Sequence, residues 1–193
     1  MPPIVLASTS PYRRELLQRL RLPFSVQAPQ VDEQPLPGEA PRDTARRLAL
    51  AKAKAVATDR PGAIVIGSDQ VADVDGEALS KPGTHEAALA QLTRMQGREI
   101  VFQTAVAVVD ADGRPLVDDV PTAVRFRVLP NAQLDAYLRA EQPYDCAGAA
   151  KIESLGITLV ESVRSDDPTA LIGLPLICLT KMLAACGVLL PAQ

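Results

Sequence analysis

Apolar residues recur along the chain at two spacings, which predict strands and helices. Short apolar runs rich in β-branched residues indicate buried strands over 4–7, 64–71, 100–110, 122–129 and 157–163. Apolar residues three and four apart indicate helices over 42–58 and after Ser10, Thr84, Asn131 and Asp167. No linker or repeat separates these elements, so we expect residues 1–193 to form one domain.

The predicted strand over 64–71 carries the residue that we place at the chemical centre. Its apolar run ends in Gly67-Ser68 and then the acid Asp69, a pattern typical of a buried strand that delivers a carboxylate at its rim. The chain then turns at Asp75-Gly76 and returns through Lys81, so a hairpin should bring this lysine back toward Asp69.

A second lysine stands inside the apolar arc of the helix predicted over 42–58. Lys52 follows Leu48 by four residues and precedes Val56 by four, whereas Lys54 points away from that arc. A lysine in this position must either extend its ammonium to solvent or meet an anion, and both outcomes stay open.

The first strand and helix predict an anion site. The apolar run over 4–7 ends at Ser8, and Ser10 with Pro11 forms a strong helix start. Free N–H groups and the helix dipole favour a phosphate there, and Arg13 and Arg14 follow in the first turn. The alternative is two solvated arginines behind an ordinary cap.

The segment 26–42 is rich in proline and acids, which indicates an irregular surface connection. Long ordered loops are often functional, so Glu33 could supply a metal ligand. A solvated acidic loop is the alternative.

Composition and charge exclude several classes of function. The net charge of −3 argues against nucleic-acid binding driven by a basic surface. No apolar span approaches the ~20 residues of a membrane helix and no signal peptide is evident, so we expect a cytoplasmic protein without membrane contact. The single histidine, His85, is expected to be solvated, and the three cysteines fit neither a disulfide framework nor a zinc site.

These elements should gather several cations around one or two acids. Hydroxyls without a base partner exclude a serine or thiol hydrolase site. Phosphoryl chemistry suits the set, because cations and a divalent metal can hold a polyphosphate while a carboxylate orients or deprotonates water. Whether Asp69 would take the proton or hold the metal stays open.

The chain resembles the Maf-like nucleoside triphosphate pyrophosphatases. Motifs in the same order cover essentially the whole chain: Leu6-Ala7-Ser8-Thr9-Ser10-Pro11-Tyr12-Arg13-Arg14, Val31-Asp32-Glu33, Lys52-Ala53, Gly67-Ser68-Asp69-Gln70-Val71, Lys81-Pro82 and Gly173-Leu174-Pro175-Leu176. The resemblance implies an α/β fold of the inosine-triphosphate-pyrophosphatase type, with a long mixed sheet flanked by helices and two lobes around a cleft. It also implies a homodimer and hydrolysis between the α and β phosphorus of a nucleoside triphosphate, with Mg²⁺ or Mn²⁺.

The resemblance assigns roles by position. Asp69 matches the proton acceptor and Glu33 an acidic position that we assign, with Asp69, to metal binding. The phosphate-contacting positions are Ser8, Arg13, Lys52 and Lys81.

Three further positions resemble a code for the base, which reads Tyr12, Gln70 and Glu153 here. This combination resembles the branch that hydrolyses 7-methyl-GTP, whereas the dTTP/UTP branch carries Arg, Thr and Gln. A cationic 7-methylguanine would gain ~1–2 kcal/mol on Tyr12 by stacking and cation–π attraction. Glu153 would accept from its N1–H and amino group.

Three alternatives accompany this interpretation. The first is a pyrophosphatase for dTTP, UTP or another non-canonical nucleotide. The second is a nucleotide-binding regulator of cell division without turnover, which would not need the acid Asp69 beside Lys52 and Lys81. The third, a structural or interaction domain, is disfavoured because no separate apolar surface stripe is evident.

Overall fold

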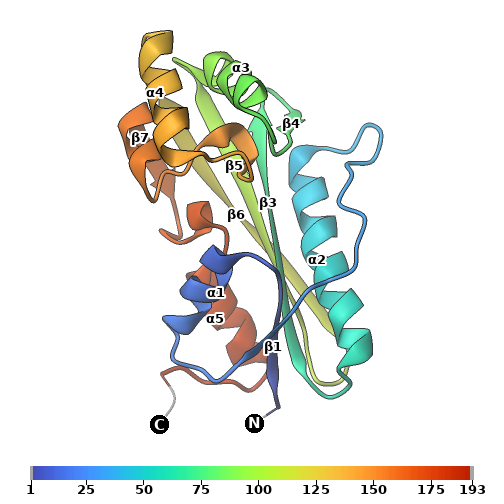
Figure 1. Ribbon diagram of the computed structural model, residues 1–193. Coiled ribbons are helices and arrows are strands. Elements are labelled where there is room, and N and C mark those ends of the chain that lie inside the picture. The colour runs from blue at the N-terminus through green and yellow to red at the C-terminus, as the bar shows by residue number, and fades with distance from the viewer. Residues whose placement is uncertain (1, 192–193) are drawn as a thin grey trace.

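The computed structural model describes residues 2–191, which form one mixed β-sheet covered by helices (Figure 1). The strands are β1 (Ile4–Ala7), β2 (Ser25–Gln27), β3 (Ile64–Val74), β4 (Glu77–Leu79), β5 (Glu99–Val109), β6 (Pro115–Phe126) and β7 (Val160–Ser165). The α-helices are α1 (Pro11–Gln18), α2 (Pro41–Asp59), α3 (His85–Met95), α4 (Asn131–Glu141) and α5 (Leu176–Ala185). Three 3-10 turns complete the set: η1 (Ala147–Ala149), η2 (Leu155–Leu159) and η3 (Ala170–Ile172).

The sheet has the order β2-β1-β3-β5-β6-β7, and the short β4 pairs with β3. The pairs β1–β2 and β1–β3 are parallel, and the other pairs are antiparallel. The predicted α/β fold with a long mixed sheet is therefore confirmed.

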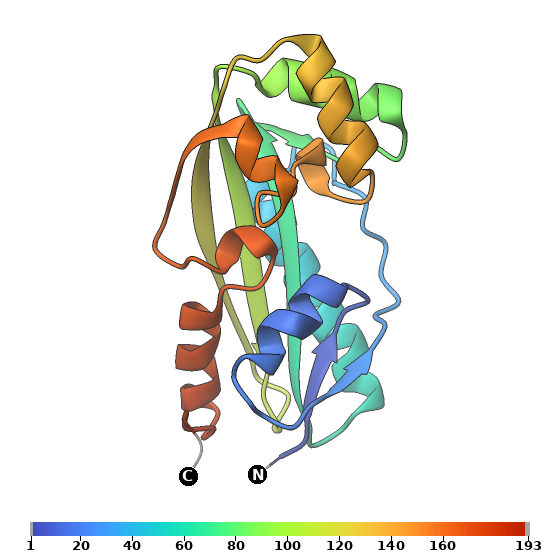
Figure 2. The ribbon, with the colours of Figure 1, turned by 60° about the vertical axis from the view of Figure 1, so that its left-hand side comes forward.

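Helices cover both faces of the sheet, and the molecule has two lobes (Figures 1 and 2). Side chains alternate along β3, so Val65 and Val71 pack toward α2 while Ile64 and Ile66 join the core under α1 and α5. Ala72 joins a third core with α3 and α4 at the far end of the long strands. The two lobes are thus built on the two ends of one sheet.

One edge of β3 has a gap in its strand pairing. β1 pairs with β3 as far as Gly67, and β4 pairs with β3 only from Ala72. Residues 68–71 of β3, which include Asp69 and Gln70, therefore pair with neither β1 nor β4 along this edge. The loops that follow β1 and β4 flank the gap.

The prediction that Asp69 stands at the rim of its strand is wrong, since β3 continues to Val74. Gly67 does not end the strand. A Cβ there would lie 2.3 Å from the Ala49 carbonyl oxygen and 2.7 Å from the Ala53 nitrogen, so the glycine allows α2 to approach β3 closely.

Two other strands also have boundaries that differ from those predicted. The strand expected over 157–163 begins at Val160, because residues up to Leu159 form the turn η2. The strand expected over 122–129 ends at Phe126, and Val128 beyond it is 77% exposed. Within residues 2–191, no helix has the length and apolar character needed to cross a membrane.

Candidate active site

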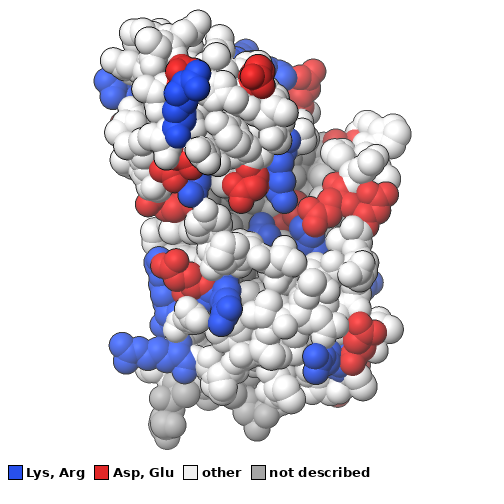
Figure 3. Space-filling model, in the orientation of Figure 1, with Lys and Arg blue, Asp and Glu red and all other residues white. Residues whose placement is uncertain are grey.

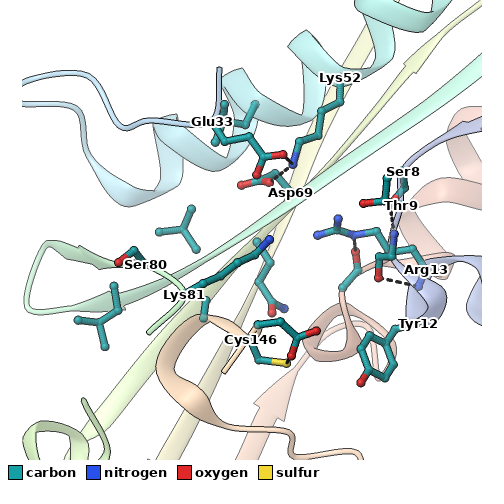
Figure 4. A pocket seen from close by; sticks show the side chains of 18 of the residues that line it. Ser8, Thr9, Tyr12, Arg13, Glu33, Lys52, Asp69, Ser80, Lys81 and Cys146 are labelled. Carbon is teal, nitrogen blue, oxygen red and sulfur yellow. Dashed lines mark hydrogen bonds and ion pairs between the residues drawn. The ribbon is translucent and has the colours of Figure 1, made fainter. Parts of the chain in front are cut away.

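A cavity of about 630 Å³ lies over the gap between β1 and β4. It is lined by all nine residues to which the family resemblance assigns a role: Ser8, Tyr12, Arg13, Glu33, Lys52, Asp69, Gln70, Lys81 and Glu153. Figure 3 shows charged side chains of both signs around the hollow between the lobes, and Figure 4 shows the cavity from close by. A cavity of this size suits a nucleotide-sized ligand.

A buried ion pair stands at the centre of the cavity wall. Lys52 Nζ lies 2.7 Å from Asp69 Oδ1 and 3.1 Å from Glu33 Oε1 (Figure 4). The side chains of Lys52 and Asp69 are 6% and 10% exposed, whereas that of Glu33 is 50% exposed. Lys52 therefore meets anions, which decides between the two outcomes left open by the sequence.

The same two carboxylates are the candidates for a metal site. No cluster of three or more His, Cys, Asp or Glu side chains with metal-binding geometry is found within residues 2–191. Mg²⁺ is often bound by only one or two carboxylates together with substrate phosphates and water. Asp69 and Glu33 fit that pattern, because both carboxylates contact the Lys52 ammonium and therefore lie close together.

The start of α1 forms the opposite wall. Ser10 caps the helix by accepting from Arg13 N, and Ser8 Oγ accepts from Ser10 N at 3.1 Å. The Arg13 guanidinium points into the cavity and donates from Nε to the Gly173 carbonyl at 2.8 Å (Figure 4). Burial lowers the pKa of Arg13 against the pull of Asp69 and Glu33, but an arginine stays charged.

Only one of the two arginines at this helix start faces the cavity. Arg14 is exposed and is not among the lining residues, because successive helical side chains point about 100° apart. The prediction of two guanidiniums beside one anion is therefore wrong for Arg14.

Gln70 is fixed by bonds that the sequence did not reveal. Its Nε2 donates to the carbonyls of Ala170 and Leu171 at 3.1 and 2.9 Å and approaches Thr104 Oγ1 at 2.9 Å. Because two carbonyls can only accept, the amide nitrogen must face them. The Gln70 Oε1 therefore points away from these carbonyls, and an amide oxygen can act only as a hydrogen-bond acceptor.

The far end of the cavity is formed by the segment around η1. Glu153 remains solvent-accessible but lies in a concave wall, where desolvation raises the pKa of its carboxyl. Burial raises the pKa of the Cys146 thiol to about 12, so this cavity-lining cysteine stays a neutral thiol rather than a nucleophile. Lys151 Nζ lies 5.3 Å from the centre of the Tyr12 ring.

His85 lies outside the cavity and differs from its prediction. Its side chain is only 22% exposed, and its ring nitrogens contact Tyr144 Oη at 3.1 Å and Asp135 Oδ1 at 2.9 Å. The Tyr144 carbonyl accepts from Gly83 N at 3.0 Å. His85 is thus a packed residue of α3 that contacts both α4 and Tyr144, and Tyr144 in turn binds the backbone next to Lys81.

Comparisons with known proteins show the family to which the chain belongs. The profile described as "Maf-like protein" matches residues 3–186. A protein of Polaromonas sp. (strain JS666) named "7-methyl-GTP pyrophosphatase" is 64% identical over 192 residues, which cover 99% of this chain and 88% of that one. A protein of Bordetella pertussis with the same name is 61% identical and covers 96% and 93% of the two chains.

A solved structure was also matched, that of a nucleoside-triphosphatase or dITP/XTP pyrophosphatase from Mycobacterium abscessus. It aligns with a TM-score of 0.43 and 22% identity over 66% of this chain and 76% of that chain. The family profile spans nearly the whole chain, and the relatives share well over half of its residues. The chain belongs to the Maf family.

Proposed function

We propose that the protein hydrolyses 7-methyl-GTP to 7-methyl-GMP and pyrophosphate. The observation that carries the proposal is the single cavity in which a buried Lys52–Asp69 pair faces Arg13 and Lys81, with Tyr12 and Glu153 at its far end. Relatives at 61–64% identity bear the name 7-methyl-GTP pyrophosphatase, which supports the same substrate.

The phosphate chain is held by cations and donors from both sides of the gap in the sheet. Arg13 is oriented by the Gly173 carbonyl, so its terminal N–H groups are pre-positioned for phosphate oxygens. Ser8, in the loop just before α1, and Lys81, in the loop after β4, contact the same phosphate chain from opposite sides. Fixing three phosphates this way brings the α–β bridge next to Asp69.

Asp69 then acts on the attacking water. The water oxygen forms a bond to the α-phosphorus, and the bond from that phosphorus to the bridging oxygen breaks with its electron pair going to pyrophosphate. Asp69 accepts the proton that the water loses, and Lys52 balances the charge of the carboxylate before the reaction.

We further propose that Glu33 and Asp69 hold a divalent cation, Mg²⁺ or Mn²⁺. When bound, such a metal neutralises the negative charge that develops on the phosphate oxygens. Two carboxylates of which one is half-exposed suit a cation that arrives with the nucleotide.

The base is read by an aromatic ring and two acceptors. Tyr12 stacks on the purine, and Glu153 and the Gln70 oxygen accept from its N–H groups. A pyrimidine with carbonyls in those places would leave the acceptors unpaired, which disfavours dTTP and UTP.

We also propose a homodimer in the cytoplasm that acts on free nucleotides rather than on nucleic acid or membranes. Family membership supports this, and light scattering of the purified protein measures the oligomeric state.

A panel of triphosphates tests the proposed function. The purified protein is incubated with Mg²⁺ or Mn²⁺ and 7-methyl-GTP, GTP, ITP, UTP or dTTP, and pyrophosphate release is followed. We expect preference for 7-methyl-GTP and at least a 100-fold loss of kcat in Asp69→Asn. Preference for UTP or dTTP would keep the chemistry and refute the base assignment, and no turnover of any nucleotide would refute the function.

A further inference from the structure

Lys151 has no role in the proposed mechanism, yet it contacts Tyr12, a residue that lines the cavity. Its ammonium lies 5.3 Å from the centre of the Tyr12 ring, within the range of a cation–π contact. Tyr12 lines the cavity, whereas Lys151 is not among the lining residues. A permanent cation therefore sits on the aromatic ring that is proposed to stack on the base.

Lys151 is held in place from several directions. Its Nζ lies 2.8 Å from Glu141 Oε1, and the two side chains are only 18% and 11% exposed. The backbone nitrogen of Lys151 donates to Tyr137 Oη, and the backbone carbonyl of Lys151 accepts from the nitrogens of Ser154 and Gly156. The contact with Tyr12 is thus a fixed part of the structure that spans the cleft from the α4 side to α1.

The other end of the Glu141 carboxylate is also occupied. Glu141 Oε2 accepts from Ser154 Oγ at 2.8 Å and from Leu155 N at 3.2 Å. Glu141 is therefore tied to the segment that carries Lys151 and the cavity residue Glu153. The Lys151 ammonium on Tyr12 is thus paired with the Glu141 carboxylate, and the carboxylate of Glu153 lies in the wall of the same cavity.

We propose that Lys151, held by Glu141, is a specificity-determining residue that sets how strongly the site prefers a cationic purine over a neutral one. The inference rests on the proposed function. A cationic base on Tyr12 is attracted by Glu153 and repelled by Lys151, while a neutral base feels neither charge strongly. The positive charge of Lys151 therefore limits the preference for a cationic purine, and the negative charge of Glu141 strengthens that preference.

Two substrates with identical phosphate chains isolate this effect. The ratio of kcat/KM for 7-methyl-GTP to kcat/KM for GTP cancels any change in phosphate binding or catalysis that the two share. Removing the cation in Lys151→Met should raise this ratio about three- to tenfold, the size expected for unit charges roughly a nanometre apart in a partly screened site. Glu141→Gln removes the negative charge but keeps an oxygen that accepts from Lys151, so it should lower the ratio by a similar factor.

Matched variants separate charge from structure. Lys151→Arg keeps the positive charge, so its ratio of the two kcat/KM values should equal that of the wild type. Lys54→Met removes an exposed lysine from the outer side of α2 and should leave the ratio unchanged. A structural role for Lys151 would change melting temperature and both kcat/KM values together, without moving the ratio.

The outcomes distinguish the inference from the function on which it rests. A wild-type enzyme that hydrolyses both substrates, with a ratio that rises in Lys151→Met and falls in Glu141→Gln, supports the inference. An unchanged or lower ratio in Lys151→Met overturns it and leaves the proposed function standing. A wild-type protein that hydrolyses neither triphosphate refutes the proposed function itself.

Discussion

The substitution Gly67→Ala tests how the fold positions the ion pair at the centre of the cavity. The new Cβ would lie 2.3 Å from the Ala49 carbonyl oxygen and 2.7 Å from the Ala53 nitrogen. Both atoms belong to the backbone of α2, so no side-chain rotation can relieve the contact. The helix must move away from β3, and Lys52 moves with it, away from Asp69.

The size of this effect follows from the overlap. Restoring an ordinary contact requires α2 to shift by about 1 Å, and overpacking of this kind costs about 1–3 kcal/mol of unfolding free energy. A displacement of about 1 Å between catalytic groups reduces turnover on the order of 100-fold. We therefore expect both a loss of stability and a much larger loss of kcat than unfolding alone explains.

The assay combines urea unfolding with steady-state pyrophosphate release at a temperature where every variant is folded. Ala88→Val is the matched control, because Ala88 is fully buried in the α3–α4 core, a cluster that includes no residue of α2. This control should lose similar stability and keep most of its kcat. A Gly67→Ala protein that loses stability but retains wild-type kcat would refute the idea that helix approach positions Lys52.

Two further predictions concern stability. Asp167 is 2% exposed and accepts from the backbone nitrogens of Ile177 and Cys178 at the start of α5, so Asp167→Ala should cost about 2–3 kcal/mol in urea unfolding; a change below about 0.5 kcal/mol would contradict the capping role. The hydrogen bond from Arg47 holds the pKa of Glu39 at about 2, below its ordinary 4.5. A depressed carboxyl pKa stabilises the fold above the ordinary value, so Glu39→Gln should be less stable than wild type at pH 6, and the difference should shrink as pH falls from about 4.5 toward 2; a difference independent of pH would count against this pair.

Local signals in the sequence predicted much of the site. The cap at Ser10 and the buried position of Lys52 both follow from helix geometry within a few residues, and the structure shows both. The hairpin that returns Lys81 follows from the turn at Asp75-Gly76, and Lys81 does line the same cavity as Asp69.

Contacts between distant segments could not be predicted in this way. The carbonyl of Gly173 orients Arg13 across 160 residues of sequence, and carbonyls near it fix Gln70 across about 100. Backbone carbonyls carry no residue-specific signal, so only the folded chain shows such partners. The same holds for Lys151 on Tyr12, which the spacing of residues does not indicate.

The error over Asp69 has a physical cause as well. A glycine within an apolar run usually weakens a strand, and the Gly67-Ser68 pair therefore resembles a strand end. Here Gly67 marks the place where a helix crosses the strand at close range, and β3 continues for seven more residues to Val74.

Identification of the products formed from 7-methyl-GTP tests the central claim most directly. Wild-type protein and Asp69→Asn are incubated with 7-methyl-GTP and a divalent cation, and the products are separated by ion-exchange chromatography. We predict 7-methyl-GMP and pyrophosphate in equal amounts from the wild type and almost no product from Asp69→Asn. Formation of 7-methyl-GDP and orthophosphate, or equal turnover by both proteins, would contradict the account.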